Sequence, residues 1–298
     1  KRSVIAIAAV ASLISTPVFA NSDLWKTQGW ITDFSKSSIS FDEILSGGPP
    51  KDGIPSIDDP KFVVAKDVNH LGPLEPVIRL VIDGDVRAYP LQVMTWHEIV
   101  NDVVGGKPVA VTYCPLCNAA IVFDANVDGS VLTFGTTGKL RNSDLVMYDR
   151  ATESWWQQFT GTGIVGANLG KELKLIPARL ESWASFSKRH PEGKVLVPNN
   201  PGFRNYGRNP YIGYDDAARP FLYNGSMPEG ISPMARVVLV RREGAEPLVL
   251  AMQKVRDAGE IKMDGFVFSW EAGRASALNS AYISKGKDVG AITVERLD

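Results

Sequence analysis

The feature that most constrains this chain is its only pair of cysteines, which lie at the junction of two short apolar stretches. Cys114 and Cys117 are separated by a Pro-Leu dipeptide. The β-branched stretch 109–113 runs directly into the first cysteine, and a second apolar stretch, 119–123, follows the second. We therefore predict two strands joined by a tight turn that aims both sulfurs at one point.

The flanks of the pair distinguish between known uses of a Cys-x-x-Cys motif. In thioredoxin-like proteins the first cysteine opens a helix, whose N-terminus lowers the pKa of the thiol. Residues 119–123 are too few and too apolar for the long amphipathic helix that this use requires. The strand-turn-strand pattern is more similar to the metal-binding knuckles of rubredoxins and zinc ribbons. Closed sites of that kind need a second cysteine pair, which is absent, so other side chains must complete a metal site here.

The segment before the first strand offers the other ligands. We predict a helix over 91–100, followed by a turn at Asn101 and Asp102. His97 on this helix is the predicted third ligand, and Met94 shares its face one turn earlier. The two thiolates and His97, with Met94 or water as the fourth ligand, would suit Cu, Zn or Fe.

The sequence predicts two proton shuttles and leaves other uses of the cysteines open. In a metalloenzyme with an open coordination position, Glu98 or Asp144 would move the proton. In a thiol-disulfide protein, Cys114 would attack or be attacked and Cys117 would resolve the mixed disulfide. In a non-catalytic binding module, the two cysteines would form an inert structural disulfide.

A cluster of polar residues around two tryptophans predicts a ligand pocket. Such a mixture can line a concave site for a small polar or sugar-like ligand. The alternative is that the polar residues cap turns while the tryptophans fill the core. The predicted pocket residues are Arg141, Asn142, Ser143, Asp149, Trp155, Trp156 and Gln157.

The first twenty residues predict export. Lys1 and Arg2 precede an apolar run at 4–14, and small residues end at Ala20. This is the order of a secretory signal peptide, and the run is shorter than the roughly 20 residues of a membrane span. We expect cleavage near Ala20 and a periplasmic or secreted protein, with no integral membrane segment in the mature chain. Disulfides persist in that compartment, so a periplasmic redox partner belongs to the thiol-disulfide alternative.

The rest of the chain predicts a mainly β fold with short helices, of the α+β class. Residues 21–60 read as an extended arm, broken by glycines and prolines, and residues 61–298 as a β-rich domain. Within it we hypothesise an internal repeat of two related β-rich units, 77–135 and 236–295.

The repeat has a definite register. A strand, a turn and a second strand occur at the start of each unit, and the stretch 109–113 resembles 266–270 without gaps. In that register Glu271 is opposite Cys114, and Arg274 is opposite Cys117. The thiols would then be a specialisation of one copy rather than a requirement of the fold.

The charges exclude one class of partner. The chain has 32 basic and 33 acidic residues, a net charge of -1, and no block of like charge. A nucleic-acid or anionic-membrane partner requires a basic patch, so we expect a small molecule or a metal ion instead.

Several sequence blocks occur in order along the chain, at 112–118, 134–149, 154–161, 190–191 and 206–211. These blocks and their order resemble the DUF3179 family of exported bacterial and archaeal proteins, and the stretch 112–118 resembles the hallmark of that family. The resemblance covers roughly 77–250. It implies a domain of unknown function and transfers no catalytic residue.

Overall fold

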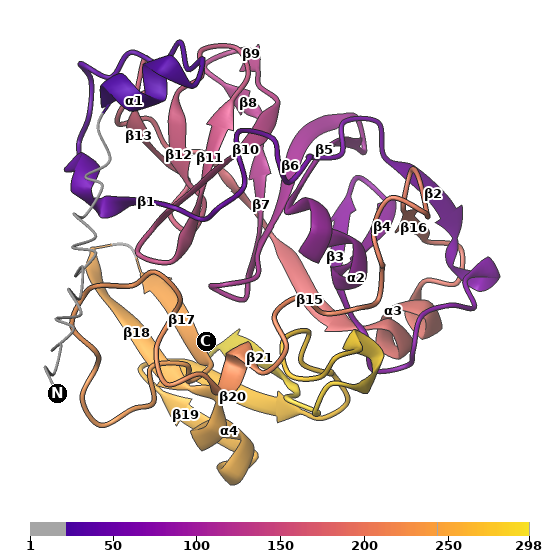
Figure 1. The fold of residues 1–298 in the computed structure, drawn as a ribbon. Coiled ribbons are helices and arrows are strands. Elements are labelled where there is room, and N and C mark those ends of the chain that lie inside the picture. Colours follow the sequence, from indigo (N-terminus) through magenta and orange to yellow (C-terminus); the bar gives the residue numbers. More distant parts are fainter. Residues whose placement is uncertain (1–21, 243, 298) are drawn as a thin grey trace, which may run out of the picture.

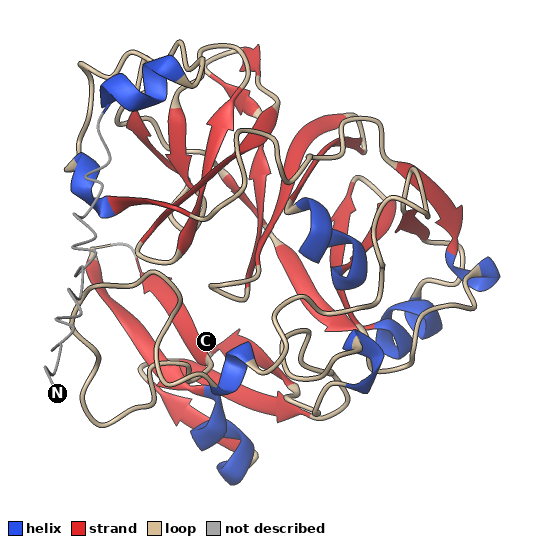
Figure 2. Cartoon of the chain, viewed as in Figure 1, coloured by secondary structure: helices blue, strands red, loops and turns tan. Residues whose placement is uncertain are grey.

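Strands dominate the computed structural model, which describes residues 22–242 and 244–297. Strands make up 41% and helices 14%, so the prediction of a mainly β fold with short helices is confirmed (Figure 2). The predicted signal peptide lies outside the described residues. Of the described helices, none has the length and apolar character needed to cross a membrane.

The described strands form three larger sheets. Two of them carry the cysteine pair and Asp144. The cysteine-bearing sheet has the order β14-β7-β6-β5. Its strands are β5 (Ile99–Val104), β6 (Lys107–Cys114), β7 (Ala119–Asp124) and β14 (Leu175–Ile176). The sheet facing it has the order β1-β10-β11-β12-β13. Its strands are β1 (Ile44–Ser46), β10 (Phe134–Arg141), β11 (Asp144–Asp149), β12 (Trp155–Gln157) and β13 (Thr162–Val165).

The third sheet, with the order β15-β3-β4-β16-β2, flanks these two (Figure 1). Its strands are β2 (Lys61–Val64), β3 (Pro76–Ile82), β4 (Asp85–Pro90), β15 (Ala178–Ser182) and β16 (Lys194–Val197). The hairpin β3-β4 turns at Asp83 and Gly84, both at positive φ, as a tight two-residue turn requires. A small hairpin, β8 (Asn126–Val127) and β9 (Ser130–Val131), extends from β7.

The C-terminal part forms a separate β unit that lies below the two site-bearing sheets in Figure 1. It contains a two-stranded and a three-stranded sheet. Its strands are β17 (Val237–Arg242), β18 (Ala245–Ala251), β19 (Glu260–Met263), β20 (Phe266–Glu271) and β21 (Ala291–Arg296).

The helices are short. The α-helices are α1 (Ser22–Thr27), α2 (Leu91–His97), α3 (Trp183–Arg189) and α4 (Met252–Ala258). Single 3-10 turns are η1 (Phe41–Glu43), η2 (Ala65–Asp67), η3 (Tyr214–Asp216) and η4 (Ile283–Lys285). Ser182 caps α3, and its hydroxyl accepts the N–H of Ser185.

The helix expected over 91–100 and the turn expected at Asn101 and Asp102 were wrong at their boundary. The helix α2 ends at His97, because Glu98 leaves the helical conformation with φ 59° and ψ -33°. The chain then enters β5 directly. Asn101 is a strand residue whose side chain joins the two site-bearing sheets: its amide donates to the carbonyl of Phe134 and accepts the N–H of Phe134, both at 2.8 Å.

The core that supports the site lies between the two facing sheets. Apolar side chains of β5, β6 and β7 meet those of β10, β11 and β12 there. The buried members include Ile99, Ala110, Cys114, Phe123, Phe134, Met147 and Trp156. The first thiol is therefore part of a packed core, whose neighbours restrict its position.

The segment expected as an extended arm packs on the outer face of the β10-β13 sheet. The rings of Trp25, Trp30 and Phe34 surround Trp155, with centroids 4.7, 5.2 and 5.3 Å from it. Farther along, β1 pairs with β10 as an edge strand. The arm thus completes the sheet that carries Asp144.

Two parts of the chain share the same order of elements. The order strand, strand, helix, strand, strand runs through β3, β4, α2, β5 and β6, and again through β17, β18, α4, β19 and β20. Both helices contain seven residues. They end at residues of positive φ, Glu98 and Gly259, whose carbonyls accept the N–H of Tyr113 and Trp270, respectively. These shared elements follow the register derived from sequence, in which Tyr113 is opposite Trp270, and the internal repeat stays a hypothesis.

Candidate functional site

The two cysteines lie at a tight turn between antiparallel strands. Cys114 ends β6, and the turn returns the chain to β7. The N–H of Cys117 points at the sulfur of Cys114 at 3.4 Å, and the N–H of Asn118 bonds the carbonyl of Pro115 at 3.1 Å. Asn118 has φ 49°, a left-handed value that asparagine tolerates better than most residues. Both thiols are free.

A third side chain, Asp144, meets the two thiols from the facing sheet. Its Oδ1 accepts a hydrogen bond from the thiol of Cys117 at 3.1 Å. Its Oδ2 is held by the N–H of Phe159 at 3.0 Å and by the amide of Gln157. The ligand atoms of Cys114, Cys117 and Asp144 all lie within 4.8 Å of one another. We call these three residues the thiol–carboxylate site.

The position of Asp144 follows from the hairpin that precedes it. Asn142 and Ser143 form the two-residue turn between β10 and β11, with φ 52° and 65°. Positive φ at both residues is the conformation that matches the twist of the flanking strands. The turn also brings the carbonyl of Ser143 to 3.6 Å from the sulfur of Cys117. Two tight turns on facing sheets thus bring together three groups that lie far apart in sequence.

The electrostatics of the site favour its protonated forms. Burial is the main cause that raises the pKa of Cys114 and of Asp144. The pKa of Cys117 is raised by its hydrogen bond with Cys114 and also by burial. Among the described residues, no lysine, arginine or histidine bonds to these three groups. Deprotonation of the site would therefore leave buried negative charge to which no described protein cation bonds directly.

Glu98 lies near this site in a strained backbone conformation. Burial, and then the charge of Asp144, raise the pKa of Glu98 to about 8. Its carboxyl group has no hydrogen-bond partner among the described residues, although only 6% of the residue is exposed. The pair φ 59° and ψ -33° is a poor one for a residue with a Cβ, and Gly259 has the equivalent conformation in the second unit.

The structure places the other two predicted ligands elsewhere. His97 donates its Nδ1–H to the carbonyl of Pro55 at 2.7 Å, and its Nε2 accepts from the hydroxyl of Tyr206 at 2.8 Å. Burial lowers the pKa of His97, which fits a neutral ring. Met94 is fully buried in the core beneath α2. Neither is part of the thiol–carboxylate site, whereas Asp144, predicted only as a proton shuttle, is.

A cavity of about 660 Å³ opens beside Cys117, between the two turns and the C-terminal unit. Asn142 and Ser143, two of the predicted pocket residues, line it. Tyr214, Asp215, Arg236 and Arg274 line its other wall. The sequence did not single out Asp215 or the two arginines as pocket residues. The signal available for Arg274 was its place opposite Cys117 in the register of the repeat.

The remaining predicted pocket residues support the sheet rather than line this cavity. Trp155 and Trp156 are fully buried, and the indole N–H of Trp156 donates to Asp149 at 2.9 Å. Arg141 forms an ion pair with Glu43 at 2.6 Å. Gln157 holds the carboxylate of Asp144.

Comparison with known proteins gives a family but no biochemistry. A family described as "Protein of unknown function (DUF3179)" matches residues 51–298. No curated protein and no solved structure matches the chain. The matched region includes the thiol–carboxylate site, the cavity and both units of the hypothesised repeat.

Proposed function

The chain belongs to the DUF3179 family, and we propose that it binds a metal ion through Cys114, Cys117 and Asp144. The observation that carries the proposal is the convergence of these ligand atoms within 4.8 Å of one another in a largely buried site to which no cation of the described residues bonds. A divalent cation would balance the charge of two thiolates and a carboxylate. It would also make their deprotonation favourable at neutral pH.

The donor set favours zinc among the metals predicted from sequence. Thiolates suit Zn and Cu(I), whereas a carboxylate ligand suits Zn better than Cu(I). Three protein ligands leave one position of a tetrahedral ion for water or substrate, as catalytic zinc sites do. When bound there, zinc would act as a Lewis acid on that fourth ligand.

Glu98 is the proposed proton carrier of the site. Its carboxyl is unbonded, buried and close enough to Asp144 for the charge of one to raise the pKa of the other. A carboxyl with a pKa near the working pH can both accept and donate a proton. Asp144, in contrast, is held at both oxygens, which suits a ligand of fixed orientation.

The thiol-disulfide alternative draws on one observation, the close approach of two free thiols. A reactive thiol needs a lowered pKa, however, and here burial raises the pKa of both cysteines. No helix begins at Cys114 to offset this effect, because the motif lies between two strands.

Metal content tests the proposal directly. The full chain, prepared anaerobically with zinc in the medium, should retain about one zinc per chain, as expected for a single site. Cys117→Ser and Asp144→Asn should each lose zinc and retain the fold. Asp128→Asn is the matched control, because Asp128 is an exposed acid paired with Lys171 on the surface. Elemental analysis and titration of free thiols give the result.

Two outcomes oppose the proposal. A protein that contains neither zinc nor free thiols would have a disulfide between the two cysteines. If only a strong reductant opened that disulfide, its role would be structural. Zinc that remains in both Cys117→Ser and Asp144→Asn would place the metal elsewhere.

We also propose that the protein is exported, on the basis of the signal-like order of residues 1–20. Expression of the full chain in a bacterium, followed by fractionation, tests this. A mature N-terminus near residue 21 in the periplasmic fraction is the expected result, and an unprocessed chain in the cytoplasm opposes it.

A further inference from the structure

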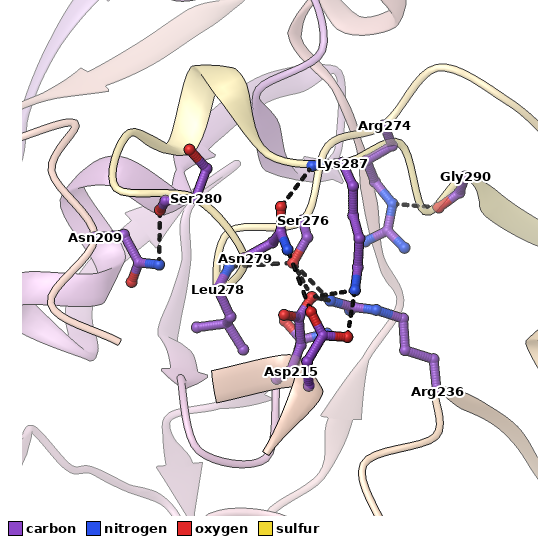
Figure 3. A network of polar contacts seen from close by, with 12 residues as sticks. Asn209, Asp215, Arg236, Arg274, Ser276, Leu278, Asn279, Ser280, Lys287 and Gly290 are labelled. Carbon is purple, nitrogen blue, oxygen red and sulfur yellow. Dashed lines mark hydrogen bonds and ion pairs between the residues drawn. The ribbon is translucent and has the colours of Figure 1, made fainter. Parts of the chain in front are cut away.

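Arg274 is a buried cation with free hydrogen-bond donors at the wall of the cavity. It follows β20, and only 8% of the residue is exposed. Its Nε donates to the carbonyl of Gly290 at 2.7 Å, which fixes the guanidinium (Figure 3). Its two terminal amino groups have no acceptor among the described residues, and Arg274 lines the cavity. An arginine has five N–H donors, so most of this group is left for a ligand.

The other arginines of the cavity wall have acidic partners. Arg236 forms an ion pair with Asp215 at 3.2 Å, within the network that also includes Ser276 and Lys287 (Figure 3). Arg179 lies 3.5 Å from a carboxylate oxygen of Glu271. Arg274 has no such partner within the described chain.

Asp288, the acid whose charge acts on Arg274, is already engaged by backbone groups. Both oxygens of Asp288 accept backbone N–H groups, from Gly273, Arg274 and Gly290. Burial and the charge of Arg236 lower the pKa of Arg274 to about 10, so it remains a cation at neutral pH. A buried cation without an ion-pair partner is costly, and such a cation at a cavity is suited to bind an anion.

We propose that Arg274 binds the carboxylate of a small organic acid whose apolar body fills the cavity toward Cys117. One guanidinium with free donors matches one carboxylate in charge and in fork geometry. A phosphate dianion carries two charges, whereas this wall offers one arginine without an acidic partner among the described residues. Leu116, Ile121, Phe159 and Leu278 give the cavity apolar walls, and its volume is in the range of small-molecule sites.

This assignment deepens the proposed function, on which it rests for one point only: that the far end of the ligand meets a metal. Cys117 and Arg274 both line the cavity, one from each unit. An acid held by Arg274 would therefore present its other end to the open position beside Cys117. The binding of the carboxylate itself requires no metal.

Benzoate and its uncharged analogue benzamide test the assignment on the full chain without metal. Calorimetry should detect benzoate binding and much weaker benzamide binding. Arg274→Gln should weaken benzoate by more than about tenfold, the loss expected for hydrogen bonds to a charged group. Arg274→Lys retains the charge but lacks the forked pair of donors, so its affinity for benzoate should lie between those of the original chain and Arg274→Gln. Arg256→Gln is the matched control, because Arg256 is exposed on α4 and pairs with Asp257.

A measurement on the unmodified chain avoids dependence on the fold of a variant. Phenylglyoxal reacts with accessible guanidinium groups, and peptide mass spectrometry identifies the arginine modified. Benzoate should slow the modification of Arg274 and leave that of Arg256 unchanged. An Arg274 that is not reached, or that reacts equally fast with benzoate present, contradicts the proposal. So does equal binding of benzoate and benzamide.

The two proposals can fail separately. Cys117→Ser should lose zinc and still bind benzoate, and Arg274→Gln should lose benzoate and still bind zinc. If the unmodified chain binds zinc but not benzoate, only the proposed carboxylate site is contradicted. If it binds benzoate but not zinc, only the proposed metal site is contradicted.

Discussion

Glu98 and Gly259 hold the same place in the two units, and the difference between them bears on function. Each ends a seven-residue helix at positive φ and negative ψ, and each carbonyl accepts the N–H of an aromatic strand residue. Glycine adopts such a conformation at no steric cost, whereas a glutamate there is strained. The fold alone would favour glycine at residue 98. The presence of an acid beside the thiol–carboxylate site therefore supports a chemical role for its carboxyl group.

Glu98→Gly should make the protein more stable. The substitution removes the backbone strain and an unbonded buried acid, so the free energy of unfolding should rise by about 1–3 kcal/mol. Glu98→Gln removes the acid but retains the backbone strain, so it separates the contribution of the acid from that of the strain. Chemical denaturation of both variants gives the result. A loss of stability in Glu98→Gly would mean that its side-chain packing outweighs the strain.

The same residue predicts a pH dependence of stability. The pKa of Glu98 rises from an ordinary 4.5 to about 8 in the folded state. The folded state therefore binds the proton of Glu98 more tightly than the unfolded state does. The stability that this proton contributes is complete below pH 4.5 and is lost as the pH rises to about 8. A pKa that differs by one between the folded and unfolded states changes the free energy of unfolding by about 1.4 kcal/mol. Unfolding of the metal-free protein across this range should show a smaller decline in Glu98→Gln.

Glu75 offers a matched control for that measurement. It is also buried, and burial raises its pKa to about 7. Its Oε2 accepts the N–H of Gly72 at 2.6 Å, and it is not part of the thiol–carboxylate site. Glu75→Gln should flatten the pH profile in the same sense without an effect on zinc content. An unchanged profile in both variants would contradict the account.

At the scale of elements, two tight turns determine the site. The turn after β6 depends on Asn118 at φ 49°, whose side-chain oxygen also accepts the hydroxyl of Tyr113 at 3.1 Å. A β-branched residue at this position would meet its own backbone and force the turn to open. Because the turn aims both sulfurs, its conformation should control metal affinity.

Asn118→Val should lower the free energy of unfolding by about 1–2 kcal/mol, the cost of left-handed backbone for an L-residue. It should also weaken zinc binding. Asn118→Gly retains the turn and loses only the bond with Tyr113, so its zinc affinity should remain close to that of the original chain. Competition with a zinc chelator measures both. Equal affinity in Asn118→Val would show that the turn does not control the site.

The local turns could be predicted from sequence, whereas the partners they bring together could not. The apolar flanks of the cysteines predicted the strand-turn-strand motif, since that signal is local. The third ligand was assigned to His97 because it is near in sequence and suits metals. Asp144 comes from a facing sheet, and only long-range packing sets its distance from Cys117. The positive φ of Glu98 ended α2 early, and a helical periodicity does not reveal such a break.

At the scale of the whole molecule, a polar network joins the C-terminal unit to the segment before it. Asp215 accepts the hydroxyl of Ser276 at 2.7 Å and pairs with Arg236 and Lys287. These residues come from η3, the position before β17 and the segment after β20 (Figure 3). Asp215 and Arg236 also line the cavity, so the network supports one of its walls. No local sequence pattern predicted it, because its members span more than 70 residues.

Asp215→Asn should destabilise the protein strongly. The change leaves Arg236, whose side chain is only 17% exposed, without its acid partner, and loss of one member of a largely buried pair costs about 3 kcal/mol. Asp257→Asn, which removes an exposed pair with Arg256, should cost less than about 1 kcal/mol. Thermal and chemical unfolding measure both. Equal small effects would mean that water compensates Arg236.

The placement of the cavity between the two units has a consequence for selectivity. Cys117 belongs to the turn at the end of β6, and Arg274 to the segment after β20, which are equivalent places in the proposed repeat. Each unit then supplies one of the two groups that contact the ends of the ligand. The angle at which the units pack sets the distance between Cys117 and Arg274, and hence the length of the acid that can span it. Relatives could change their preferred ligand by substitutions at the packing surface, with every ligand-binding side chain retained.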